Sequence, residues 1–206
     1  MFKQYLFVIF LVLMFGCNQS CRKNDCTNNN SNVRISNKKA DSICKVNLEI
    51  VNQAMVMDTL QIVSTQKLLY YPFGEHNNIQ NFSKKFPLKT KIKETNQDND
   101  MFYIFFLGKS RVTAFLSEDF FGKYERIVNI INSEINDNSI ILYDTVRIGI
   151  TKSNFAQIFN LNDVEGFEDI RVIEFISALS GIWHYYTFDE NDRLKKIEIK
   201  TDYTFE

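Results

Sequence analysis

The sequence has few of the residues that interrupt regular structure, with only 2 Pro and 7 Gly among 206 residues. This scarcity excludes a low-complexity chain rich in proline and glycine. Cysteine is also rare, and all four cysteines lie in the first quarter of the chain: Cys17, Cys21, Cys26 and Cys44. No Cys-x-x-Cys pair occurs, and the histidines, His76 and His184, are distant in sequence, so we expect no metal site.

Neither sign of charge is in excess. The chain has 24 Lys and Arg against 25 Asp and Glu, a net charge of −1. A nucleic-acid-binding protein needs a basic footprint, so we expect no nucleic-acid partner. A glycine-rich phosphate loop and a Gly-x-Ser-x-Gly nucleophile motif are both missing from the sequence. We therefore expect a protein without a cofactor and without enzymatic activity.

The first residues have the pattern of an export signal. Lys3 precedes an apolar run from Tyr5 to Phe15, which is followed by Gly16 and Cys17. A positive start, a short apolar run and a small residue before the break are typical of a signal peptide. A membrane-spanning helix needs roughly 20 apolar residues, so this run is short for a permanent anchor.

The segment Leu13-Met14-Phe15-Gly16-Cys17 resembles the lipobox of bacterial lipoproteins. This resemblance implies that residues 1–16 are a signal peptide cut before Cys17, whose sulfur receives a diacylglycerol. Acyl chains such as palmitate then hold the protein at a membrane. The alternative is an ordinary signal peptide with a coincidental cysteine. Cys21 and Cys26 are candidates for a disulfide that leaves Cys44 free, although the pairing of the three remains open.

Residues 17–40 are rich in Asn, Lys, Arg and Ser and have little to bury, which predicts a disordered tether. Some lipoproteins carry a run of acidic residues after the acylated cysteine as a surface-export signal. Such a run is missing after Cys17. We therefore expect a lipid-anchored protein of the cell envelope, at the outer membrane and facing the periplasm.

The body is expected to begin near Asp41 and to comprise two units, residues 41–135 and 136–206. Apolar and polar alternation and apolar runs predict strands at 45–64, 88–94, 101–107, 111–116, 124–135, 140–150, 170–176, 182–188 and from 194 onward. A phase change at Val172-Ile173 suggests a bulge. Short helices are predicted around Ile79 and Phe82, and after Thr151, whose hydroxyl is a candidate N-cap.

The same plan occurs twice, since Gly74 and Gly149 each precede a short helix and then an aromatic-rich hairpin. The stretch Val146 to Lys152, with Trp183 to Ile199, resembles small bacterial envelope lipoproteins of the SmpA/OmlA type and the wider β-lactamase-inhibitor-protein-like fold. The resemblance implies an α+β architecture of two similar halves, each a short helix packed on an antiparallel sheet. It also implies non-catalytic work in envelope assembly or protein binding.

The aromatic hairpin offers a possible binding surface formed by Trp183, Tyr185 and Tyr186. Rings of this kind bind sugars or peptides by stacking, but an aromatic hairpin is more often core on one side and cross-strand packing on the other. In a strand, His184 shares a face with Tyr186, whereas Trp183 and Tyr185 share the opposite face.

Other polar residues have simpler interpretations. Glu75 and His76 are adjacent at a helix start, and neighbouring residues of a helix do not face each other. The acidic residues Glu118, Asp119 and Glu125 suit a solvated loop. The lysines at 84, 85, 89, 91 and 93 suit either an anionic partner or protection of an exposed strand edge.

These observations favour a non-enzymatic, lipid-anchored envelope protein that binds another envelope protein or assists assembly. Two alternatives remain at this point. One is a module that captures a glycan or peptide with Trp183, Tyr185 and Tyr186, and the other is a hydrolase whose carboxylate pair is assembled only by folding.

Overall fold

A computed structural model of the chain describes residues 45–85, 90–95, 101–119, 121–179 and 181–202, with only the backbone for residues 85 and 90–95. The chain divides into two units, residues 1–40 and 41–206, and all described residues belong to the second. The predicted signal peptide, the tether and all four cysteines therefore lie outside the described residues.

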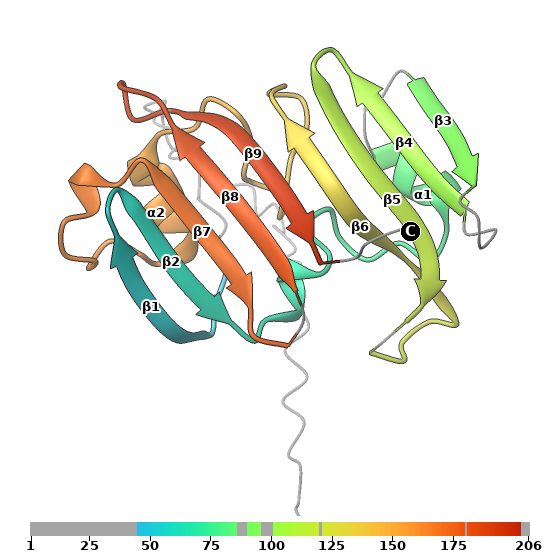
Figure 1. Ribbon diagram of the computed structural model, residues 1–206, viewed down its shortest axis with the longest axis horizontal. Coiled ribbons are helices and arrows are strands. Elements are labelled where there is room, and N and C mark those ends of the chain that lie inside the picture. Colours follow the sequence, from blue (N-terminus) through green and yellow to red (C-terminus); the bar gives the residue numbers. More distant parts are fainter. Residues whose placement is uncertain (1–44, 86–89, 96–100, 120, 180, 203–206) are drawn as a thin grey trace, which may run out of the picture. The chain divides into compact units, whose positions relative to one another are not determined.

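The described residues form one nine-stranded sheet with the strand order β1-β2-β7-β8-β9-β6-β5-β4-β3 (Figure 1). The strands are β1 (Ile50–Val56), β2 (Thr59–Ser64), β3 (Thr90–Thr95), β4 (Met101–Leu107), β5 (Ser110–Glu118), β6 (Arg126–Ile135), β7 (Val172–Ser177), β8 (Ile182–Phe188) and β9 (Leu194–Thr201). Neighbouring strands are antiparallel except for β2 and β7, which run parallel. The fold is thus a mixed sheet, richer in β-structure than the α+β architecture predicted from the sequence.

Two short α-helices, α1 (Ile79–Lys85) and α2 (Lys152–Phe159), lie on one face of this sheet (Figure 1). A single row of residues, each opposite the next on the neighbouring strand, connects the part of the sheet under α2 with the part under α1. The row consists of Ile62, Phe175, His184, Ile199, Ser133, Val112 and Phe105. All seven residues are buried. We refer to this side of the sheet as the helix face and to the other side as the outer face.

Aromatic side chains attach each helix to the helix face. In α2, the ring of Phe155 lies 4.8 Å from that of Tyr186, and the ring of Phe159 lies 4.8 Å from that of Phe175. In α1, the ring of Phe82 lies 5.2 Å from that of Phe105. Burying an aromatic side chain contributes about 1.5–3 kcal/mol, which is why such short helices are stable here.

The start of α2 agrees with the prediction. Thr151 has an extended backbone, and its hydroxyl oxygen accepts a hydrogen bond from the Asn154 amide at 3.2 Å. The next residue, Lys152, is buried, and its ammonium group donates to the carbonyls of Glu168 at 2.6 Å and Ile170 at 3.1 Å. These bonds join the start of α2 to the segment that leads into β7.

Two local predictions were wrong. Residues 140–150 form no strand, but a turn with one isolated bridge between Leu142 and Val146. Tyr143 and Asp144 adopt left-handed φ values of 52° and 59°, which reverse the chain and direct the apolar residues inward. The sheet register is continuous at Val172-Ile173, and the bulge near the last hairpin lies between Thr187 and Phe188.

Candidate functional site

The outer face of β7, β8 and β9 carries a group of polar and aromatic side chains. Glu198, Tyr185, Glu174 and Gln61 lie directly opposite one another on β9, β8, β7 and β2. The adjacent row places Trp183 opposite Lys200. We call these six residues the outer-face surface: Gln61, Glu174, Trp183, Tyr185, Glu198 and Lys200.

Contacts within and between strands link five of these six side chains. The Gln61 amide donates a hydrogen bond to the Glu174 carboxylate at 2.7 Å. The Lys200 ammonium lies 4.9 Å from the centre of the Tyr185 ring and 3.7 Å from the Glu198 carboxylate. A cation over an aromatic face is attracted by the electron density of the ring. Aromatic rings and long side chains that are ordered in this way have little conformational entropy to lose when a partner binds.

The phenol of Tyr185 stays neutral over the physiological range. Partial burial and then the hydrogen bond to the Glu174 carboxylate raise the pKa of Tyr185 to about 12. Both effects disfavour the phenolate, the first by desolvation and the second by charge. Tyr185 therefore presents a hydrogen-bonding group and a ring face, not a charge.

The structure separates the three residues of the predicted binding surface. Trp183 and Tyr185 lie on the outer face and are half-buried, whereas Tyr186 is on the helix face with none of its surface exposed. Tyr186 packs between Phe155 and Phe175. It is therefore part of the core and is removed from the exposed surface, because alternate residues of a strand point to opposite sides.

His184 is also a core residue. Its Nδ1 is 2.8 Å from the Tyr143 hydroxyl and 3.3 Å from the Tyr186 hydroxyl. Burial lowers the pKa of His184 to about 3, so the ring is neutral at physiological pH. The ring links β8 to the turn that contains Tyr143 and has no access to solvent.

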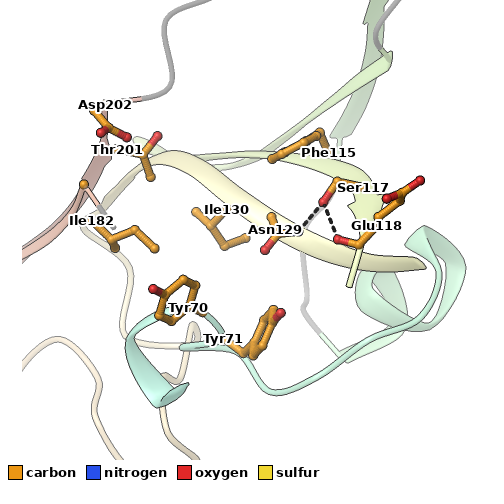
Figure 2. Close-up of a pocket in the computed structure, with 11 residues that line it drawn as sticks. Tyr70, Tyr71, Phe115, Ser117, Glu118, Asn129, Ile130, Ile182, Thr201 and Asp202 are labelled. Carbon is orange, nitrogen blue, oxygen red and sulfur yellow. Dashed lines mark hydrogen bonds between the residues drawn. The ribbon is translucent and has the colours of Figure 1, made fainter. Parts of the chain in front are cut away.

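A cleft of about 240 Å³ lies where β6 and β9 separate (Figure 2). These two strands pair only where Asn132–Ile135 of β6 lies opposite Ile197–Lys200 of β9. At the end of this paired segment, the Thr201 hydroxyl donates a hydrogen bond to the Ile131 carbonyl at 3.0 Å. Beyond this point Ile130 and Ile182 form an apolar floor, and Tyr70 and Tyr71 close the side opposite the sheet (Figure 2). Ligand pockets for small molecules usually have volumes of about 300–1,000 Å³, so this cleft suits one side chain better than a whole ligand.

The cleft does not bring two carboxylates together. Its acidic lining residues are Glu118 and Asp202, which Figure 2 shows at opposite ends of the cleft. The nearby Asp119 has a structural role, since its carboxylate accepts hydrogen bonds from the amides of Phe121, Lys123 and Tyr124. Desolvation by itself would raise the pKa of Asp119, but the hydrogen bonds from these amides outweigh it and hold the pKa below its usual range.

The remaining polar candidates also have structural contacts. The Glu75 carboxylate pairs with Lys67 at 2.9 Å and with Lys123 at 2.6 Å. The Nε2 of His76 lies 3.0 Å from the Phe73 carbonyl. Among the predicted basic residues, Lys84 is exposed on α1 and the segment around Lys91 and Lys93 is the edge strand β3.

Within the described part of the chain, no three His, Cys, Asp or Glu side chains gather closely enough to hold a metal ion. The helices described are too short or too polar to cross a membrane. Comparisons with family models, with curated proteins and with solved structures found no match to this chain.

Sequence reasoning identified Trp183 and Tyr185 but missed their partners. Gln61 is 113 residues from Glu174 in sequence, and the pair meets only because β2 lies parallel to β7. The cleft was also missed, because its residues come from β5, β6, β8, β9 and the turn at Tyr70. The alternation in β9 was the one signal that assigned Lys200 and Glu198 to a solvent-facing side.

Proposed function

We propose that this chain is a lipid-anchored protein of the bacterial cell envelope, attached through Cys17, whose body binds another envelope protein through the outer face of its sheet. The observation that carries the proposal is the position of Trp183 and Tyr185, which are partly exposed on the face opposite α1 and α2. Tyr and Trp are enriched at protein interfaces, because they combine a large apolar area with a hydrogen-bonding group.

The order of the elements supports this proposal. α1 is followed in sequence by β3, β4, β5 and β6, α2 is followed by β7, β8 and β9, and β6 pairs with β9. We infer two similar halves, each a short helix followed by antiparallel strands and joined edge to edge through β6 and β9, as the resemblance to SmpA/OmlA-type and β-lactamase-inhibitor-protein-like domains implies. β1 and β2 precede α1 in sequence but extend the second half by pairing with β7, so the halves do not coincide with residues 41–135 and 136–206. Those families act by binding and not by catalysis.

Capture of a glycan or peptide is a second candidate, because Trp183 and Tyr185 are two residues apart on one strand face. Rings at this spacing can stack on neighbouring units of an extended ligand. Since the chain has a single Trp, its fluorescence reports directly on this site. Titration with envelope glycans should change the emission if the face captures them, and unchanged emission with every glycan rejects this candidate.

Two measurements test the main proposal. Mass spectrometry of the native protein should find a chain that begins at Cys17 and carries acyl groups on its sulfur. A photo-crosslinking amino acid at Thr187, on the outer face, should capture an envelope protein in intact cells. The same amino acid at Asn154, exposed on α2, is the matched control.

A Trp183→Ser, Tyr185→Ser double variant should lose the crosslink from position 187 while keeping its lipid and its fold. Equal capture from positions 187 and 154, or capture that survives the double substitution, contradicts the assignment of the outer face as the binding surface. An unmodified thiol at Cys17 contradicts the lipid anchor separately.

A further inference from the structure

Within the described residues, the outermost strand, β1, lacks the charged residues and proline that normally protect the edge of a sheet, and its one irregularity is a register shift between Ile50 and Asn52. Edge strands in natural proteins are usually blunted by charged residues, proline or a covering segment. The stretch from Ile50 to Met57 has no charged residue and no proline, and every residue of β1 is exposed. The other edge, β3, contains Lys91, Lys93 and Glu94 and conforms to the rule.

Apolar side chains are concentrated on this edge. Among the described residues, eight large hydrophobic side chains are exposed, and five of them are in this stretch: Ile50, Val51, Met55, Val56 and Met57. Val51 is 59% exposed and Met57 is 95% exposed. A concentration of this kind indicates an interaction surface, whereas single exposed hydrophobic residues do not.

The turn between β1 and β2 adds an independent observation. Met57 has a φ of 56°, a left-handed conformation that Gly, Asn or Asp usually adopts in two-residue hairpin turns. A non-glycine residue in this region costs of order 1–3 kcal/mol. The side chain of Met57 is nearly fully exposed at the tip, so packing within this chain does not compensate for the strain.

The backbone of β1 is arranged to accept another strand. Val56 and Thr59 flank the two-residue turn and are opposite each other, so they form a hydrogen-bonded pair. Alternation along the strand then directs the N–H and C=O groups of Met55 and Gln53 away from β2. β1 is the last strand of the described sheet on this side, so these groups point to its free edge.

We propose that β1 is the interface of a homodimer, in which a second copy of the chain pairs antiparallel with it through its own β1. In a two-fold dimer the same surface of each copy meets that of the other. A strand at such an interface therefore pairs with an identical strand, and its side chains must be compatible with one another. Because Ile50–Met57 is uncharged, no like charges meet in this stretch in any register. Its apolar side chains would shield one another on both faces of the joined sheet.

The dimer is expected to be reversible. A standard interface uses about 20–30 residues on each side, and β1 supplies seven. The proposal is independent of lipidation and of the outer-face surface, because β1 contributes no residue to either.

Photo-crosslinking in living cells tests the proposal with the full chain. Two copies that carry different epitope tags are co-expressed, each with the photoreactive residue at Gln53. We expect one crosslinked species of twice the chain mass that contains both tags. The matched control places the photoreactive residue at Ile92, on the charged edge β3, and should give at least tenfold less dimer.

A disrupting variant completes the test. Val51→Lys with Met55→Lys sets cationic side chains against each other and should reduce the doubly tagged species at least tenfold. Ile141→Lys, at an exposed apolar residue outside β1, should leave it unchanged. Circular dichroism verifies that each variant folds, as expected for substitutions of exposed residues. Crosslinks only to other proteins, no doubly tagged species, or a species that resists the two lysines would each overturn the proposal.

Discussion

Neighbouring residues of β8 have opposite environments. His184 and Tyr186 point into the helix face, are fully buried and contact Phe155, Phe175 and Tyr143. Trp183 and Tyr185 point to the outer face and contact mainly polar or charged side chains across the strands. The same strand therefore supplies the core on one side and a candidate binding surface on the other, and the two sides should respond differently to substitution.

The helix face should be the more sensitive side. Phe175→Ala removes a ring that contacts Phe159 and Tyr186 at the centre of the core, and a buried Phe→Ala change costs about 3–5 kcal/mol. Chemical denaturation should show this loss of unfolding free energy. Thr187→Ala, on the outer face of the next strand, serves as the control and should cost less than about 1 kcal/mol. Similar losses in the two variants would contradict the asymmetry between the faces.

The second-largest loss of stability is expected at the buried N-terminal end of α2. Lys152→Met keeps the apolar stem but removes the ammonium group that bonds the carbonyls of Glu168 and Ile170. The variant leaves the buried Ile170 carbonyl without this donor and also removes the 2.8 Å ion pair between Lys152 and Asp192. A buried acceptor without a partner costs about 1–3 kcal/mol, and we expect a loss of about 2 kcal/mol in thermal or chemical unfolding. Lys195→Met, at an exposed position of β9, should be neutral within about 0.5 kcal/mol. A neutral result at Lys152 would show that solvent reaches these carbonyls.

The pH dependence of stability should reveal the burial of His184. Its pKa is about 3 in the folded protein and near 6.5 when unfolded, so only the unfolded chain takes up this proton between those values. Stability should therefore fall as the pH is lowered from about 7 to 5, with a slope approaching about 1.4 kcal/mol per pH unit. His184→Gln should give a shallower slope over the same interval. Identical slopes would mean that the histidine is accessible to protons in the folded state.

The outer face should give the smallest effect on stability. Lys200→Met removes an exposed cation from the Tyr185 ring and from Glu198, contacts that contribute at most about 0.5–1 kcal/mol. We expect a change below about 0.5 kcal/mol in unfolding free energy, whereas crosslinking to the proposed partner should weaken. A large loss of stability instead would make Lys200 a structural residue.

Local patterns predicted much of the secondary structure. The alternation in β9, the hairpin of β4 and β5, and the N-cap at Thr151 each follow from residues close together in sequence, and the structure confirms them. The strand predicted at 140–150 failed for a tertiary reason. Ile140, Leu142 and Val146 are apolar because a turn buries them against the core, and β-propensity does not distinguish that case from a strand.

In β8 and β9 the sequence by itself determined which residues share a side of the strand, because side chains alternate along an extended chain. It separated Tyr185 from His184 on that basis alone. Tertiary structure decided which residues meet: the parallel pairing of β2 with β7 brings Gln61 to Glu174, and the separation of β6 from β9 opens the cleft. Those contacts join residues far apart in the chain, and their geometry depends on the strand order, which no local pattern encodes.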